Sequence, residues 1–128
     1  MIWIQLIIVL ALIQLATFVV IVGKARDRFG VKAPAIYGNP DFERYYRVQM
    51  NTIELLILFI PSIFLASIYW SPYLMAVLGL VYLIGRILYF FAYTQNKNRV
   101  VAFLMSFLPI VVFLIAGLFG TIRALINI

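Results

Sequence analysis

The chain has no cysteine and no histidine, and only 11% of its 128 residues are charged. Without cysteine it forms no disulfide bond and carries no thiol nucleophile, and without histidine it has no imidazole for acid–base catalysis. The same two absences exclude a zinc site of the usual kind, so we expect no metal cofactor. Thiol chemistry at this protein would therefore need a thiol that a ligand supplies.

Polar residues are scarce throughout. Hydrophobic residues make up 66% of the chain, whereas soluble proteins are about half apolar and about a quarter charged. We therefore expect an integral membrane protein, and the length allows one domain, residues 1–128. The first apolar segment has no basic residues before it, so we expect a permanent span and not a cleaved signal peptide.

Four apolar stretches predict an all-α bundle of four transmembrane helices, since about 20 helical residues cross a bilayer. The predicted spans are at about 2–22, 42–70, 72–93 and 100–122. Ser71 and Pro72 form a good helix cap and first turn, so the second and third helices should form a tight hairpin. The glycines and prolines of residues 23–40 predict a long loop. The polar residues 94–99 predict a short loop. Pro61 and Pro109 fall inside spans, where neighbouring helices tolerate a kink.

Basic residues gather beside the first and third loops. They are Lys24, Arg26, Arg28, Lys32, Arg44, Arg47, Lys97 and Arg99, while Arg123 lies at the opposite end. By the positive-inside rule, the first and third loops should be cytoplasmic and both termini should face the other side. The net charge of +6 is then a signal of topology. Nucleic acid is not an expected partner, and attraction to anionic lipid headgroups explains the same residues.

A polar stripe runs along the start of the second helix. On a helical wheel Arg44, Arg47, Asn51 and Glu54 fall within about 80° of one another, and Glu43 widens the arc to about 100°. Gln49 points elsewhere. Ionised groups at the edge of a bilayer are costly unless they pair with each other or with a polar ligand, so this stripe is a candidate functional site.

The third helix carries a second stripe, formed by Tyr82, Arg86, Tyr89 and Tyr93. Facing stripes would offer guanidinium groups for carboxylates, a carboxylate for an ammonium group, an amide and phenols. A small zwitterion of net negative charge fits such a pocket, with a hydrophobic co-substrate arriving from the lipid. The alternative is purely structural: ion pairs that join helices, and an interfacial belt of aromatic residues. We expect Arg86 to be structural, as the partner of an acid in the second helix.

Written out, the segments are Glu43-Arg44-x-x-Arg47-x-Gln49-x-Asn51-x-x-Glu54 and Gly79-Leu80-Val81-Tyr82-Leu83-x-x-Arg86-x-x-Tyr89-Phe90-x-x-Tyr93. Together, in a four-span chain of this size, they closely resemble the MAPEG family, the membrane-associated proteins in eicosanoid and glutathione metabolism. The pattern is most similar to its glutathione transferase and leukotriene-conjugating branch, over essentially the whole chain. The resemblance implies a homotrimer of four-helix subunits, with glutathione as co-substrate bound between neighbouring subunits.

The resemblance also implies roles for single residues. One subunit would bind glutathione through Arg47, Asn51, Glu54, Tyr89 and Tyr93, and the next would contribute Arg26 and Gln49. Arg99 would be catalytic, by stabilising the glutathione thiolate. Apart from the resemblance, we expect Glu43, Arg44 and Arg86 to be structural polar residues. This chain departs from the family pattern at two points: Leu55 stands where a tyrosine is common, and Arg99 follows Tyr93 by six residues instead of seven. Lys97 is therefore an alternative source of the positive charge.

The expected function is that of a membrane-bound glutathione transferase, with glutathione-dependent peroxidase activity. The thiolate would attack a lipophilic electrophile or reduce a lipid hydroperoxide. One alternative is a non-catalytic lipid-binding scaffold of the same family, although that branch characteristically lacks the arginine found here at position 47. The other alternative is a small multidrug transporter, which would carry an acid in its first helix, where this chain has only Gln5, Gln14 and Thr17 as polar residues.

Overall fold

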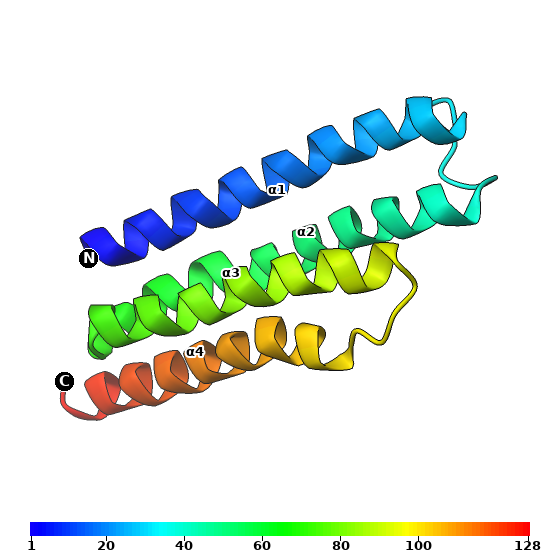
Figure 1. The fold of residues 1–128 in the computed structure, drawn as a ribbon. Coiled ribbons are helices and arrows are strands. Elements are labelled where there is room, and N and C mark those ends of the chain that lie inside the picture. The colour runs from blue at the N-terminus through cyan, green and yellow to red at the C-terminus, as the bar shows by residue number, and fades with distance from the viewer.

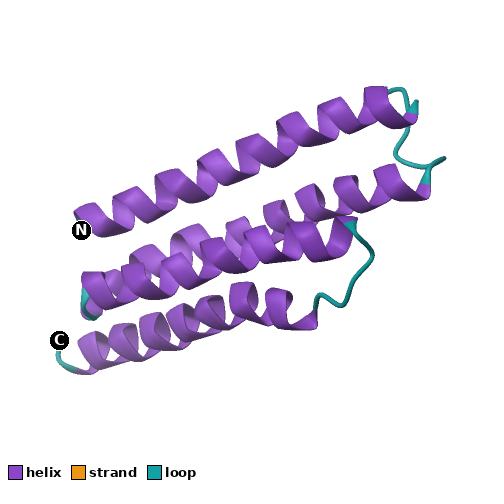
Figure 2. Cartoon of the chain, in the orientation of Figure 1, coloured by secondary structure: helices purple, strands orange, loops and turns teal.

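The computed structural model describes residues 1–128 and consists of four helices joined by loops, with no strand (Figure 2). The helices are α1 (Ile2–Phe29), α2 (Pro40–Tyr69), α3 (Pro72–Thr94) and α4 (Val100–Ile126). All four are long and apolar enough to cross a membrane. The predicted fold class, an all-α bundle of four helices in an integral multi-pass membrane protein, is confirmed.

The helices run antiparallel to their neighbours in the chain (Figure 1). Both termini and the α2–α3 turn lie at one end of the bundle, and the α1–α2 and α3–α4 loops lie at the other, which we call the two-loop end. Helices α2 and α3 are central, since each packs against all three other helices, whereas α1 and α4 do not pack against each other. Side chains of α2 and α3 are therefore the ones that every other helix can help to position.

The first helix is longer than the sequence predicted. We expected a loop from Gly23, but α1 continues to Phe29 and stops at Gly30, whose φ of 71° is left-handed. Lysine and arginine are good helix formers, so the helix continues after the apolar run has ended. The loop is correspondingly shorter, and α2 begins where Asn39 Oδ1 accepts hydrogen bonds from the N–H groups of Asp41 and Phe42 at 2.9 and 3.1 Å.

The hairpin between α2 and α3 is as tight as predicted. Trp70 and Ser71 alone separate the two helices, and the Ser71 hydroxyl accepts a hydrogen bond from the Leu74 N–H at 3.3 Å. Pro61 and Pro109 lie inside α2 and α4, as expected. The hairpin therefore holds α2 beside α3 along the length on which the two polar stripes lie.

The core joins α2, α3 and α4 through aromatic rings. Phe59 of α2 is fully buried, stacks on Tyr82 of α3 with ring centroids 3.9 Å apart, and meets Phe113 of α4 edge-on at 5.9 Å. Large apolar side chains such as Ile57 and Leu118 instead lie on the outside, 68% and 63% exposed. An apolar exterior is what a lipid environment requires, so the polar groups described next are exceptions that need a reason.

Candidate functional site

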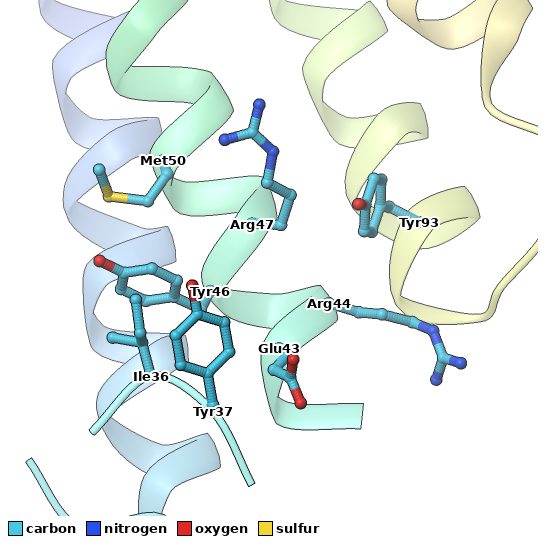
Figure 3. A pocket seen from close by; sticks show the side chains of 8 residues that line it. All are labelled: Ile36, Tyr37, Glu43, Arg44, Tyr46, Arg47, Met50 and Tyr93. Carbon is cyan, nitrogen blue, oxygen red and sulfur yellow. The ribbon is translucent and has the colours of Figure 1, made fainter. Parts of the chain in front are cut away.

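A pocket of about 490 Å³ opens at the two-loop end (Figure 3). It lies between the first turns of α2, the α1–α2 loop and the last turn of α3. Its lining residues are Ile36, Tyr37, Glu43, Arg44, Tyr46, Arg47, Met50 and Tyr93. The pocket thus combines two guanidinium groups and a carboxylate with phenols and apolar side chains.

The most prominent ion pair of the site joins Arg47 to Glu54. Arg47 Nη1 lies 3.0 Å from Glu54 Oε1, and the two side chains are 49% and 53% exposed. The residues are seven apart on α2, which places them on one face of the helix. This face points away from the core of the bundle. A half-exposed charged pair on the outside of an apolar helix is costly in lipid unless another polar partner covers it.

Two tyrosine rings near the end of α3 are stacked between two arginine side chains. The Arg86 guanidinium lies over the Tyr89 ring at 4.2 Å, and the Tyr89 and Tyr93 ring centroids are 5.4 Å apart. The Arg99 guanidinium lies over the outer ring, 4.1 Å from the Tyr93 centroid. This series, which we call the Arg–Tyr stack, reaches from the buried interior to the two-loop end. Cation–π contacts of this kind hold both the cations and the rings in place.

Arg86 is fully buried at the inner end of the stack. Its Nη1 donates to Asn51 Oδ1 at 2.7 Å and, less closely, to Thr52 Oγ1 at 3.4 Å, while its Nε donates to Ser106 Oγ at 2.9 Å. The prediction that Arg86 pairs with an acidic residue of α2 is therefore wrong. The physical reason is that α4 packs close enough to supply Ser106, and Glu54 faces outward to Arg47 instead.

Comparison with known proteins bears on this geometry. The sequence model of the MAPEG family matches residues 4–119 of the chain. The chain belongs to the MAPEG family.

Individual relatives agree with this assignment. An uncharacterized protein of Synechocystis is 42% identical over 119 residues, which span 92% of this chain and 87% of that protein. Microsomal glutathione S-transferase 2 of Homo sapiens is 34% identical over 120 residues, spanning 93% of this chain and 82% of the human protein. Leukotriene C4 synthase of Cavia porcellus is 37% identical over 75 residues, spanning 59% of this chain and 50% of the synthase.

In this MAPEG protein, eight of the predicted site residues fall into three groups. Glu43, Arg44, Arg47 and Tyr93 line the pocket. Glu54 and Arg99 lie against pocket residues, one paired with Arg47 and the other stacked on Tyr93. Asn51 and Tyr89 lie deeper and are buried. Arg44 also pairs with Asp41 at 2.6 Å, within the first turn of α2.

Arg26 and Gln49 do not line this pocket. Arg26 Nη1 donates to the carbonyl oxygen of Ala35 at 2.7 Å, and its guanidinium lies 4.9 Å from the Phe42 ring centroid. Arg26 therefore joins the end of α1 to the α1–α2 loop within the chain. Gln49 is half-buried, away from the Arg47 face. Their predicted contribution to a neighbouring subunit's site stays a prediction.

Sequence reasoning did not assign Ile36, Tyr37, Tyr46 or Met50 to the pocket. Tyr46 and Met50 are four residues apart and lie beside Arg47 on α2, so a wider arc on the helical wheel would have included them. Ile36 and Tyr37 belong to the α1–α2 loop, whose path over α2 has no periodic signal in the sequence. The loop residues could be found only from the fold.

Proposed function

We propose that this protein is a membrane-bound glutathione transferase that also reduces lipid hydroperoxides with glutathione. The observation that carries the proposal is the Arg47–Glu54 pair, outward-facing and half-exposed, beside a pocket that Tyr93 and Arg99 border. The names of two relatives, a glutathione S-transferase and a leukotriene C4 synthase, support the same class of reaction.

Glutathione has two carboxylates, one ammonium group and one thiol. A guanidinium binds a carboxylate through paired, charge-assisted hydrogen bonds, which suits Arg47. The Glu54 carboxylate suits the ammonium group. In the unliganded subunit these two side chains neutralise each other, and a zwitterionic ligand would replace each partner with a group of the same charge. Binding would therefore leave neither Arg47 nor Glu54 without a partner of opposite charge at the membrane edge.

The thiol would be activated by a nearby cation. A free thiol has a pKa near 8.5 and is only a few per cent ionised at neutral pH, and a pKa about two units lower would ionise most of it. A positive neighbour lowers a thiol pKa because it stabilises the ionised form. Arg99 is the candidate for this role, since its stacking on Tyr93 holds the guanidinium beside the pocket.

The reaction then needs no nucleophile from the protein. In the transferase reaction, the thiolate forms a sulfur–carbon bond with the electrophile and a leaving group such as halide departs with the bonding electrons. In the peroxidase reaction, the thiolate cleaves the O–O bond to give an alcohol and a sulfenic acid, which a second glutathione converts to the disulfide and water. The apolar outer surface would deliver both kinds of lipophilic substrate from the bilayer.

The outward direction of Arg47 and Glu54 also favours a site that a neighbouring subunit completes. We propose a homotrimer in which Arg26 and Gln49 reach the site from the next subunit, as the family resemblance implies. The first and third loops would face the cytoplasm, so that soluble glutathione enters from that side while the second substrate comes from the lipid.

A purified-protein assay tests the proposed function. Glutathione would be combined with an aryl halide in one reaction and with a lipid hydroperoxide in another, and conjugate and disulfide would be measured. We expect both products, with rates that fall in the Arg47→Ala variant. No product in either reaction, from a folded protein, would contradict the proposal and would favour a lipid-binding scaffold.

A further inference from the structure

Arg86 is a buried guanidinium with no carboxylate beside it. Its side chain is 0% exposed, and its hydrogen-bond partners are neutral oxygens of Asn51, Thr52 and Ser106. Its Nη2 atom has no partner. Arginine remains protonated in proteins and can only donate hydrogen bonds. A charge in this position within a membrane-spanning bundle is costly, so the contacts it does make call for an explanation beyond packing.

The shortest of these contacts fixes the orientation of Asn51. A guanidinium has no acceptor, so the end of the amide that faces it at 2.7 Å must be the carbonyl oxygen. The Nδ2 group, with its two donor hydrogens, is then turned away from Arg86. The hydrogen bond from Arg86 is the only one that the Asn51 side chain makes within the chain.

The free end of Asn51 belongs to the same face of α2 as the proposed glutathione site. Asn51 follows Arg47 by four residues and precedes Glu54 by three, and residues at these spacings lie on one side of a helix. It is 8% exposed, so a small part of the residue reaches the surface of that face. An unpartnered donor thus lies beside the Arg47–Glu54 pair.

We propose that Arg86 is a positioning residue that holds Asn51 as a donor, so that the site selects a ligand with a carboxylate at this position. The proposal rests on the proposed function. An asparagine that is free to turn can present either its oxygen or its nitrogen, because the two ends have nearly the same shape. With Arg86 in place only the nitrogen is presented. A carboxylate can accept from it, whereas an ester oxygen is a weaker acceptor without charge.

The ligands for the test are glutathione and its diethyl ester, which has lost both carboxylate charges and kept the thiol and the amino group. The affinity of the full-length protein for each ligand is measured by equilibrium dialysis in detergent. The preference is the ratio of the affinity for glutathione to the affinity for the diethyl ester. Wild type should prefer glutathione. Arg86→Met, which cannot donate a hydrogen bond, should reduce this preference by about twofold or more, because Asn51 is then free to turn its oxygen toward the ligand. Arg86→Lys, which can still donate to Asn51, should retain most of it.

Two further variants separate positioning from packing. Ser106→Ala removes another partner of Arg86 without touching Asn51, and it should leave the preference unchanged. Asn51→Asp keeps the shape of the side chain but has no donor, and it gives Arg86 a counter-charge. It should fold with a melting temperature at least equal to that of wild type and should lose the preference about tenfold or more.

Combining Asn51→Asp with Arg86→Met should produce no further loss of preference beyond that of Asn51→Asp, because Arg86 acts on the ligand only through the amide of Asn51. A wild-type preference in Arg86→Met would overturn the proposal. A wild-type preference in Asn51→Asp would overturn it equally, even if Arg86→Met does not fold. These results would leave the proposed function intact, whereas a wild-type protein that binds no glutathione would refute the proposed function itself.

Discussion

The guanidinium of Arg99 lies over the ring of Tyr93, with its Cζ atom 4.1 Å from the ring centroid. Tyr93 lines the pocket and Arg99 is the N-cap residue of α4, so the contact joins the end of one helix to the start of the next. Lys97, the other cation of this loop, is exposed. Of the two residues that could supply a charge to a bound thiol, Arg99 is therefore the one that the structure holds in a defined place.

Arg99→Ala should lower turnover and leave glutathione affinity nearly unchanged. A cation beside the sulfur acts chiefly on the ionised thiol and on the transition state, so its loss affects the chemical step more than binding of the ground state. We expect a fall of about tenfold to a hundredfold in kcat, the scale of about 1.4 to 3 kcal/mol. Steady-state rates with an aryl halide, together with glutathione affinity, measure both effects.

Lys97→Ala is the matched control for Arg99→Ala, because it removes an equal charge from the same loop. We expect kcat to change less than about twofold, since a surface charge without fixed partners contributes little. A large loss in Lys97→Ala with none in Arg99→Ala would transfer the catalytic role to Lys97. Full activity in both variants would mean that neither cation ionises the thiol.

Arg47→Ala should weaken glutathione binding by roughly 1.5–3 kcal/mol, the usual effect of losing a hydrogen bond to a charged group. Glu54→Ala should have a similar effect through the ammonium group of the ligand. Isothermal titration of purified variants measures both. Unchanged affinity in the two variants would reduce the Arg47–Glu54 pair to a structural contact of α2.

Co-expression of two inactive variants tests whether neighbouring subunits share a site. If Arg26 of one subunit acts with Arg47 of the next, mixed oligomers of Arg26→Ala and Arg47→Ala subunits will contain some sites with both arginines intact. We therefore expect part of the wild-type activity to return on co-expression, and none when the two variants are purified separately and mixed. Absence of any recovery would indicate that each site is built within one subunit. The mass of the particle in detergent should be that of three subunits.

Gly85→Ala should lower the melting temperature. A Cβ atom on Gly85 would lie 2.8 Å from Met105 Cβ and 2.9 Å from the Ser106 backbone nitrogen, so α3 and α4 would have to separate. Overpacking of this kind typically costs about 1–3 kcal/mol. Gly23→Ala is the control, because no atom lies within 4 Å of the added group. Equal melting temperatures in the two variants would show that α3 and α4 are not so closely packed.

The helices could be predicted because apolar length and cap residues are local signals. Ser71 and Pro72 mark the start of α3 by their own chemistry. The end of α1 was missed because the sequence shows where apolar residues stop, at Gly23, and not where the helix stops, at Gly30. A membrane-spanning helix can continue into the polar region for as long as its residues favour helix.

The polar stripe of α2 could also be predicted, since helical periodicity alone brings Arg47, Asn51 and Glu54 to one face. The hydrogen-bond partners of Arg86 could not be predicted from the sequence. They depend on the rotation of α3 relative to α2 and on the close approach of α4, which brings Ser106 to the guanidinium. These are tertiary relationships between segments distant in the sequence. The same holds for Tyr37, which reaches the pocket through the path of the α1–α2 loop.

The most direct test of the account is the ultraviolet absorbance of glutathione thiolate in the presence of the purified protein, titrated with pH. Free glutathione should ionise with a pKa near 8.5, as ordinary thiols do. Glutathione bound to wild type should already be mostly thiolate at neutral pH, and in Arg99→Ala the titration should move back toward that of the free thiol. A bound thiol that ionises like free glutathione in the wild-type protein would contradict the claim that this site activates glutathione.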